Sequence, residues 1–285
     1  MAVLEVNFIS EALMRTVPMY VILPVDKLPV PGAARQEVKP FKTLYLLHGI
    51  LGNYTDWLYG TRIQRWAEEK NLAVVMPSGD NASYVDRAAD HNYYGDFIGE
   101  ELVEMTRKMF RLSFAREDTF IGGLSMGGYG ALRNGLKFHN TFGYIAALSS
   151  AQPFDNINAL TEDGMYFTQK RSFRQATFGD DLEAASKSSL NPRVLVEKLV
   201  ESGNKFPDIY MACGQQDGLL ESNRQFAKFL ESYGIGVTYE EGPGGHEWDF
   251  WDRYIKRVLD WLPLDETAPG RNSGNEGLGL DINRG

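Results

Sequence analysis

A serine held between glycines constrains this chain more than any other feature of its sequence. The segment Gly123-Leu124-Ser125-Met126-Gly127 follows directly on the strand-like run 118–122. Small residues on both sides of a serine let the backbone turn sharply from a strand into a helix, so that the hydroxyl stands at the top of a sheet within reach of a histidine. Residues 126–133 can start that helix, whose first N–H groups then point back toward the serine. The pattern is weak alone, but this context and suitable partners downstream make it specific.

The rest of the chain alternates between short β-rich runs and helical patterns. This alternation predicts an α/β fold in which a mostly parallel sheet of about eight strands carries helices on both faces. The first two strands are bounded by proline before any helical signal, so we expect them to form an antiparallel edge. The expected strands are Leu4–Ile9, Val17–Leu23, Thr43–Leu47, Ala73–Met76, Thr119–Ile121, Tyr144–Leu148, Asp208–Ala212 and Val237–Glu240.

Apolar residues at helical spacing predict helices between these strands. Such stripes lie within 97–112, 226–233 and 248–262. Gly234 is the expected C-terminal stop of the second stripe. Asn191 and Pro192 are typical of the N-cap and first position of a further helix over 193–201.

Two segments break the alternation. Residues 152–207 lack a clear central strand and carry several aromatic side chains, so we expect an insertion over the carboxyl edge of the sheet. The insertion could form a satellite core of helices, an apolar wall of a substrate pocket, or both. Residues 263–285 are poor in apolar residues and are expected to be a disordered tail. This leaves 1–262 as a single α/β domain.

Composition and charge argue against several classes of partner. The formal net charge is −9, which disfavours nucleic acid and anionic membrane surfaces because both reward clustered Lys and Arg. No apolar run approaches the roughly 20 residues that span a bilayer, and the N-terminus lacks the pattern of a signal peptide. The single cysteine, Cys213, excludes an internal disulfide and fits a reducing compartment. We therefore expect a cytoplasmic protein that acts on a small molecule.

The candidate nucleophile needs a base, because a serine hydroxyl is a poor nucleophile until its proton is taken. The chain has four histidines. His246 lies in a glycine-rich loop between the last expected strand and the last expected helix, where an open α/β sheet presents catalytic groups. His48 ends the first central strand, whereas His91 and His139 lie in a polar loop and at a helix end. His246 is therefore the predicted base.

An acid must orient that histidine, and the chain order Ser…Asp…His places it between Ser125 and His246. Asp217 follows the expected strand 208–212 and precedes the helix around Phe226, so it falls on the same edge of the sheet as His246. Asp208 is the rival carboxylate, but it lies at the opposite end of that strand. Asp217 could also be an ordinary turn aspartate. Loop placement and chain order favour it as the acid.

The negative charge that develops on the attacked carbonyl oxygen needs two backbone N–H donors. One is expected from Met126, the residue after the candidate nucleophile, and the other from the loop 48–52 after an earlier strand. Ile50 is the predicted second donor, with Gly49 and Leu51 as alternatives. His48 is expected to have a structural role, or to support the catalytic residues without contacting the substrate, rather than to act as the base.

Five segments together resemble the esterase D group of α/β-hydrolases, and the resemblance covers roughly residues 1–262. These segments are Leu46-Leu47-His48-Gly49, Asn53–Trp57, Gly123–Gly128, Cys213–Asp217 and Gly244–Trp248. The group includes tributyrin esterases, feruloyl and acetyl-xylan esterases, S-formylglutathione hydrolases and mycolyltransferases. The resemblance implies that Ser125, Asp217 and His246 are nucleophile, acid and base, and that Ile50 and Met126 donate the oxyanion N–H groups.

Within that group the chain most resembles the tributyrin-esterase type, which implies a serine carboxylesterase for short-chain acyl esters. Feruloyl or acetyl-xylan ester hydrolysis stays open because the aromatic-rich insertion could hold a phenolic acyl group. S-formylglutathione hydrolases carry Leu-Thr-Cys after the oxyanion glycine, where this chain has Ile50-Leu51-Gly52, and this difference argues against that thioester. An acyltransferase, a serine peptidase and a non-catalytic binding protein are further alternatives.

Three more residues could line a substrate pocket: Trp57 and His48 near the oxyanion loop, and Gln152 at the start of the insertion. Trp57 could equally belong to the core. No His, Cys, Asp or Glu spacing is typical of a metal site and no glycine segment matches a phosphate-binding loop, so neither a metal nor a cofactor is expected. Exposed parts of the insertion could pair subunits into a homo-oligomer.

Overall fold

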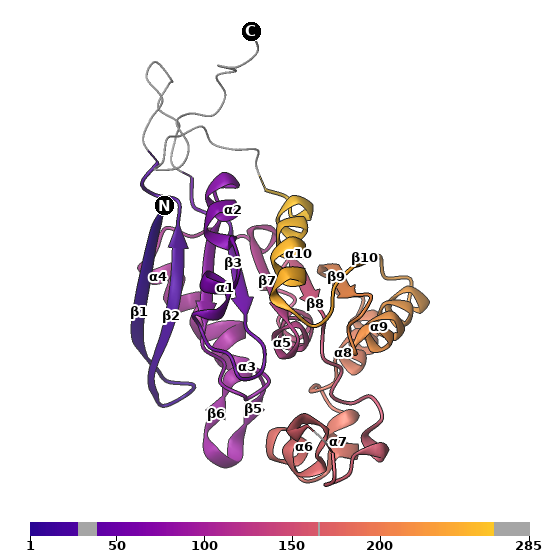
Figure 1. Cartoon of the computed structure of the whole chain (residues 1–285). Coiled ribbons are helices and arrows are strands. Elements are labelled where there is room, and N and C mark those ends of the chain that lie inside the picture. The colour runs from indigo at the N-terminus through magenta and orange to yellow at the C-terminus, as the bar shows by residue number, and fades with distance from the viewer. Residues whose placement is uncertain (28–38, 165, 265–285) are drawn as a thin grey trace.

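An eight-stranded sheet forms the centre of the molecule. The computed structural model describes residues 1–27, 39–164 and 166–264, and the strand order is β1-β2-β4-β3-β7-β8-β9-β10 (Figure 1). The strands are β1 (Ala2–Ser10), β2 (Arg15–Leu23), β3 (Thr43–Leu47), β4 (Ala73–Pro77), β7 (Thr119–Leu124), β8 (Tyr144–Leu148), β9 (Asp208–Gly214) and β10 (Val237–Gly242). All eight strands expected from the sequence are present, and the α/β fold class is confirmed.

Strand direction decides where the site can form. β1 pairs with β2 and β2 with β4 in antiparallel register, with Val21 opposite both Leu4 and Val75, so the expected antiparallel edge is confirmed. All other neighbouring strands pair in parallel. The carboxyl ends of β3, β7, β8, β9 and β10 therefore meet at one edge of the sheet, which is where ligands bind in open α/β folds.

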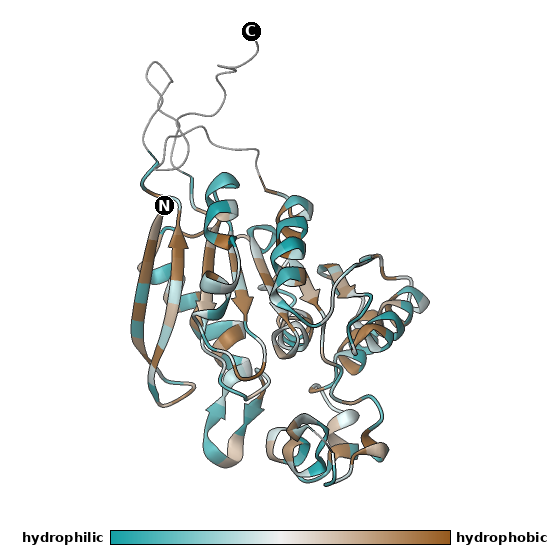
Figure 2. Cartoon of the chain, viewed as in Figure 1, coloured by the Kyte–Doolittle hydropathy of each residue, from teal (hydrophilic) through white to brown (hydrophobic). Residues whose placement is uncertain are grey.

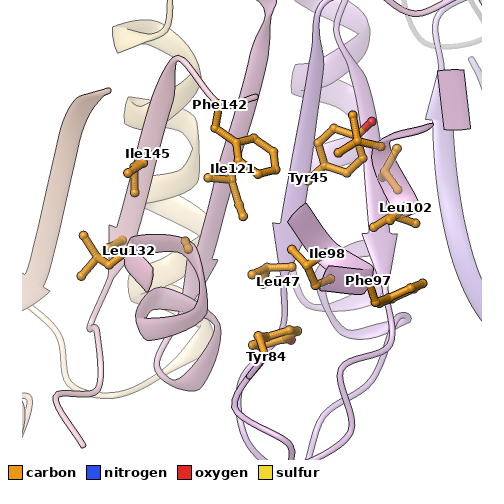
Figure 3. Close-up of a cluster of buried hydrophobic side chains, with 14 of the residues drawn as sticks. Tyr45, Leu47, Tyr84, Phe97, Ile98, Leu102, Ile121, Leu132, Phe142 and Ile145 are labelled. Carbon is orange, nitrogen blue, oxygen red and sulfur yellow. The ribbon is translucent and has the colours of Figure 1, made fainter. Parts of the chain in front are cut away.

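One face of the sheet is covered by α4 (Leu102–Met109), α5 (Met126–Lys137), α8 (Pro192–Ser202) and α9 (Leu220–Ser232). Successive residues of a strand point to opposite faces, so Tyr45 and Ile121 enter this core while their strand neighbours point away. Figure 3 shows Tyr45, Ile121 and Phe142 projecting into the same apolar core. The Asn191 side chain accepts the Arg193 N–H at 3.0 Å, which confirms the predicted N-cap of α8.

The other face is covered by α1 (Asp56–Gly60), α2 (Ile63–Glu69) and α10 (Trp248–Trp261). α2 and α10 lie side by side on this face (Figure 1). Their outward sides are hydrophilic, as Figure 2 shows. Their inward sides bury residues such as Trp66 and Phe250 against Leu44 and Leu46 of β3. Because β3 is buried on both faces, its sequence is a nearly continuous apolar run.

The sequence did not predict a small hairpin of β5 (Asp86–Arg87) and β6 (Asn92–Tyr93). Strands of two residues show no period, so they give no pattern to recognise. A 3₁₀ turn (Ala88–Asp90) connects β5 to β6, and the hairpin then leads through α3 (Tyr94–Asp96) and a π-helical segment (Phe97–Glu101) into α4. The apolar stripe expected at 97–112 is therefore helical as far as Met109, with a π-helical start.

The segment between β8 and α8 folds outside the main layers. It contains 3₁₀ turns at Ile157–Ala159 and Phe167–Gln169, followed by α6 (Arg171–Phe178) and α7 (Leu182–Ser186). α6 and α7 lie beyond the carboxyl edge of the sheet (Figure 1). Phe178 and Leu182 bury their side chains with Val85 and Tyr129 in a satellite core, which is one of the two roles expected for this segment.

The expected domain limits, 1–262 with an insertion at 152–207, stay a prediction. Apart from Pro263 and Leu264, the expected tail lies outside the described residues. None of the helices in the described ranges combines the length and apolar character that crossing a bilayer requires.

Candidate active site

Ser125 lies in a strained backbone conformation between β7 and α5. Its φ is 53° and its ψ is −115°, a region that residues other than glycine rarely adopt. Its N–H donates to the Leu148 carbonyl at 2.9 Å, and its own carbonyl accepts the N–H groups of Tyr129 at 3.1 Å and Ala151 at 3.0 Å. Ser125 is 8% exposed. Backbone strain that the surrounding structure holds in place is typical of a functional position.

Gly123 and Gly127 are needed because the backbones around this turn almost touch. A β-carbon on Gly127 would lie 2.3 Å from the Leu47 carbonyl oxygen and 2.6 Å from that of His48. A β-carbon on Gly123 would lie 2.4 Å from the Gly127 carbonyl oxygen. Any larger side chain would therefore push the end of β3 away from the start of α5.

The structure brings Ser125, His246 and Asp217 together at the carboxyl edge. The His246 Nε2 lies 3.0 Å from the Ser125 Oγ, and the His246 Nδ1 lies 2.9 Å from the Asp217 Oδ2. An ionised carboxylate only accepts hydrogen bonds, so Nδ1 carries the proton and Nε2 offers a lone pair to the serine hydroxyl. The Asp217 side chain is 1% exposed and the His246 side chain 38%.

Two opposing effects set the charge of Asp217. Burial alone raises the pKa of this carboxyl, but the hydrogen bonds from His246 and from the Leu219 N–H (2.8 Å) favour its charged form, and the pKa is lowered from its ordinary value. Asp217 is therefore ionised at neutral pH, as an acceptor for the Nδ1 proton must be.

The lowered pKa of Asp217 predicts a pH-dependent contribution to stability. A folded-state pKa below the unfolded one, about 3.9, gives stability that is present above about pH 4 and lost as pH falls through the folded pKa. The difference in unfolding free energy between wild type and Asp217→Asn should therefore shrink on acidification. Urea unfolding from pH 7 to pH 3 measures it. A difference that stays constant over this range contradicts the prediction, and Asp208→Asn, which removes an exposed carboxylate from the other end of β9, is the control.

The loop that carries His246 is fixed to the loop that carries Asp217. The Gln216 N–H donates to the Gly244 carbonyl at 3.0 Å, and the Gly244 N–H donates to the Gln216 Oε1 at 2.8 Å. A β-carbon on Gly214 would lie 2.2 Å from the Gly244 carbonyl oxygen. The histidine and its acid are thus held at a fixed separation by their own backbones.

Two backbone N–H groups beside Ser125 have no hydrogen-bond partner among the residues that the structure describes. No hydrogen bond between residues of the described ranges uses the N–H of Ile50 or of Met126. The Leu51 N–H donates to the Asn81 Oδ1 at 2.8 Å, which makes Leu51 unsuitable as the alternative donor. A β-carbon on Gly49 would lie 3.6 Å from the Ser125 Cβ, so the loop that carries Ile50 passes next to the serine.

His48 is a structural histidine. Its Nε2 accepts the Gly79 N–H at 2.8 Å, so the Nδ1 that lies 2.7 Å from the Gly49 carbonyl carries the proton and donates it. Burial lowers the pKa of the ring, which keeps it neutral. His48 is 1% exposed and cannot face a substrate, so the suggestion that it lines the pocket is corrected in favour of the structural role.

Trp57 belongs to the core, and its suggested place in the pocket is likewise corrected. It is 1% exposed, its indole N–H donates to the Leu47 carbonyl at 2.9 Å, and its ring packs edge-on against Trp248. Gln152 is half-buried, and its amide lies 3.4 Å from the Ser150 hydroxyl. Its role toward a substrate stays a prediction.

The rejected candidates lie away from this centre. Asp208 is at the opposite end of β9 from Asp217, and His139 follows the far end of α5. Cys213 is buried, and burial raises the pKa of its thiol to about 12, so it stays protonated and unreactive. Among the described residues, no group of three or more His, Cys, Asp or Glu side chains could hold a metal ion.

Comparison with known proteins agrees with this geometry. The model of the family described as "Putative esterase" matches residues 10–262. The chain belongs to this esterase family. It is 44% identical over 262 residues to an acetyl esterase of Caldicellulosiruptor saccharolyticus, covering 92% of this chain and 98% of the relative.

Two solved structures from Staphylococcus aureus are also similar to this esterase-family chain. One is FphF, a fluorophosphonate-binding serine hydrolase, with a TM-score of 0.79 and 32% identity. The other is the S-formylglutathione hydrolase FrmB, with a TM-score of 0.77 and 31% identity. Each comparison covers 92% of this chain and 98% of the other. The resemblance drawn from the sequence segments is confirmed.

Sequence reasoning missed two residues behind the site. Ser149 is fully buried directly after β8, and its backbone has a positive φ of 46°. Trp251 of α10 packs its ring edge-on against the His246 imidazole, with centroids 4.9 Å apart. Serine at a strand end is common, and Trp251 was visible only as part of an apolar stripe, so neither position carried a distinct signal.

Proposed function

We propose that this chain is a serine carboxylesterase that hydrolyses short-chain acyl esters through an acyl-enzyme. The observation that carries the proposal is the pair of hydrogen bonds that joins Ser125, His246 and Asp217, at 3.0 and 2.9 Å. This arrangement allows a base to take the serine proton while a buried carboxylate holds the base in the correct tautomer. The N–H groups of Ile50 and Met126, which donate to no acceptor within the described ranges, support it further.

The proposed reaction has two halves. In the first, the His246 Nε2 takes the Ser125 proton as Oγ attacks the ester carbonyl, and the N–H groups of Ile50 and Met126 hold the oxyanion. His246 then gives the proton to the departing alcohol, and the acyl group stays on Ser125. In the second half water attacks that acyl group by the same route, which releases the acid and restores the serine. Asp217 stabilises the imidazolium in both halves without taking its proton.

The size of the acyl group is inferred from the relatives. The relative with 44% identity is named an acetyl esterase, which supports a small acyl group. The segment beyond the carboxyl edge exposes two aromatic residues, Tyr166 and Phe167. Because aromatic side chains can contact a phenolic acyl group, a phenolic ester is included among the substrates tested.

A panel of esters tests the proposal. Hydrolysis of p-nitrophenyl acetate, butyrate and octanoate and of methyl ferulate is measured for wild type and Ser125→Ala. We expect serine-dependent activity concentrated on acetate and butyrate. A preference for methyl ferulate would move the assignment to plant-wall phenolic esters. No activity on any ester from the folded protein would reject the proposal, and product analysis with added acceptor alcohols would then test an acyltransferase.

A thioesterase is the second candidate, because one similar structure is that of an S-formylglutathione hydrolase, at 31% identity. The segment Ile50-Leu51-Gly52 argues against it, since it departs from the pattern of those enzymes. Comparing kcat/KM for S-formylglutathione and p-nitrophenyl acetate separates the two functions. A higher value for the thioester would favour the second candidate. The expectation of a cytoplasmic location stays a prediction.

A further inference from the structure

Asn223, in the first turn of α9, has a fully buried side-chain amide that the proposed reaction does not use. It is 0% exposed. Its Oδ1 accepts the Ser150 N–H at 3.1 Å, and its Nδ2 donates to the Ser150 carbonyl at 2.9 Å. The same Nδ2 donates to the Leu219 carbonyl at 2.8 Å. Both amide protons and the amide oxygen are therefore used by backbone groups, which fixes the orientation of the side chain.

The Ser150 side of this contact leads to the candidate nucleophile. Ser150 is 0% exposed and lies in the loop after β8. The next residue, Ala151, donates its N–H to the Ser125 carbonyl at 3.0 Å. Because buried backbone polar groups must find partners inside the protein, the two bonds from Asn223 fix the course of this loop and, through it, the backbone of Ser125.

The Leu219 side of the contact leads to the acid. The Leu219 N–H donates to the Asp217 Oδ1 at 2.8 Å, and the Leu220 N–H donates to the Asp217 carbonyl at 3.1 Å. Asp217 is thus tied to the same helical turn that carries Asn223. Its Oδ2 is left to face the His246 Nδ1, at 2.9 Å.

The distance between the acid–base pair and the serine is the one that needs this support. The loops that carry His246 and Asp217 are hydrogen-bonded to each other in both directions, so the pair forms one unit. The paired part of β8 and β9 ends before the loops that follow these strands. The 3.0 Å contact between the His246 Nε2 and the Ser125 Oγ therefore depends on how those two loops are held together.

We propose that Asn223 is a positioning residue that sets the distance between Ser125 and the His246–Asp217 pair. Its amide joins the loop after β8 to the first turn of α9. In this way it connects the backbone that holds the nucleophile with the backbone that holds the acid. This inference rests on the proposed roles of Ser125, Asp217 and His246.

Two substitutions test the bridge. Asn223→Ala removes all three side-chain hydrogen bonds. Asn223→Ser removes the two to Ser150, but a serine hydroxyl on a helix can donate to the carbonyl four residues earlier, which is that of Leu219. We expect both variants to lower kcat for p-nitrophenyl acetate at least about tenfold, because the serine and the histidine move apart, with a change in KM below about twofold. The serine variant should unfold at a higher temperature than the alanine variant without recovering kcat.

Asn191→Ala is the matched control. The Asn191 side chain also accepts a backbone N–H, from Arg193 at 3.0 Å, and donates to a backbone carbonyl, that of Ser186 at 2.7 Å. It joins α7 to α8, and it contacts neither of the loops that Asn223 joins. We expect its loss to lower Tm by about 2–4 °C and to leave kcat unchanged. If kcat fell in proportion to Tm across the three variants, Asn223 would serve the fold alone and the proposal would be overturned.

The ¹⁵N NMR signals of the His246 ring give a measurement that needs no substrate. The Nε2 signal reports the hydrogen bond with the Ser125 hydroxyl, and the Nδ1 signal reports the one with Asp217. We expect Asn223→Ala and Asn223→Ser to move the Nε2 signal toward its position in Ser125→Ala, which lacks the hydroxyl. The Nδ1 signal should stay in place, because the acid–base pair remains intact. Asn191→Ala should move neither signal.

These signals also separate the positioning role from the proposed function. If wild type hydrolysed no ester but the Nε2 signal moved as expected, the positioning role would stand and the proposed function would fail. If the Nε2 signal kept its wild-type position in both Asn223 variants, or if the Nδ1 signal moved with it, the positioning role would be overturned whatever the activity.

Discussion

Replacement of Ser125 by alanine is expected to lower kcat/KM for p-nitrophenyl acetate by about 10⁵-fold or more. Without the hydroxyl no acyl-enzyme can form, and His246 and Asp217 have no proton to move. What remains is the orientation of the ester and the oxyanion N–H groups of Ile50 and Met126, which catalyse only weakly on their own. Steady-state hydrolysis, with circular dichroism to confirm folding, measures the loss.

Ser83→Ala is the matched control for this prediction. Ser83 has the same 8% exposure as Ser125 and a similar positive φ of 52°, but it has no histidine partner among the described residues. Its replacement should leave hydrolysis near the wild-type rate. If Ser83→Ala and Ser125→Ala lost equal amounts of hydrolytic activity, the loss would reflect damage to the fold. If Ser125→Ala kept full activity, Ser125 would not be the nucleophile.

Ser125→Gly extends the same experiment to stability. The backbone at Ser125, with φ 53° and ψ −115°, is the mirror image of an extended conformation, which glycine adopts freely and serine does not. We expect the glycine variant to be as inactive as the alanine variant but harder to unfold, by about 1 kcal/mol. Such a pair of results would mean that the protein holds strain at this residue for the sake of the hydroxyl.

The parts of this molecule that the sequence predicted are those with local signals. Period and turn residues located all eight strands of the sheet, because each strand buries an uninterrupted apolar run or alternates between core and solvent. The candidate triad could be predicted because a parallel sheet gathers the loops after its strands at one edge. Chain order then left Asp217 and His246 as the partners of Ser125.

The parts that the sequence did not predict depend on contacts between distant segments. Nothing local shows that Trp57 turns its N–H to the Leu47 carbonyl, or that both nitrogens of His48 are used by backbone groups. Ser149 and Trp251 are 102 residues apart, and their link becomes visible only when α10 packs on the sheet. A sequence pattern reports which side chains are buried more readily than it reports what they bind.

Gly127→Ala is expected to damage both the fold and the site, because the added methyl group has backbone on two sides. It would lie 2.3 Å from the Leu47 carbonyl oxygen and 2.6 Å from that of His48. Neither atom belongs to a flexible side chain that could move away. The end of β3 must therefore shift, at a cost of about 1–3 kcal/mol in unfolding free energy. Thermal and urea unfolding measure this cost.

The same shift should reach the oxyanion donors. The Leu47 carbonyl that the methyl group displaces also accepts the Trp57 indole N–H at 2.9 Å, and the chain then runs directly into the loop that carries Ile50. A displacement of the order of 1 Å at a catalytic group costs about 10²-fold in rate. We therefore expect kcat to fall by that factor at temperatures well below unfolding, with a smaller change in KM, since the oxyanion forms only in the transition state.

Gly236→Ala separates this effect from the ordinary consequences of replacing a glycine. Gly236 is exposed before β10, and a β-carbon there would meet nothing within 4 Å, so its replacement should change the unfolding free energy by less than about 0.5 kcal/mol. If Gly127→Ala matched this control in both stability and kcat, the close approach of β3 and α5 would not determine the position of the loop 48–52, which carries Ile50. If stability fell while kcat held, the contact would serve the fold alone. A fall in both quantities, as we expect, would mean that one backbone contact supports the sheet and holds the N–H group of Ile50 beside Ser125.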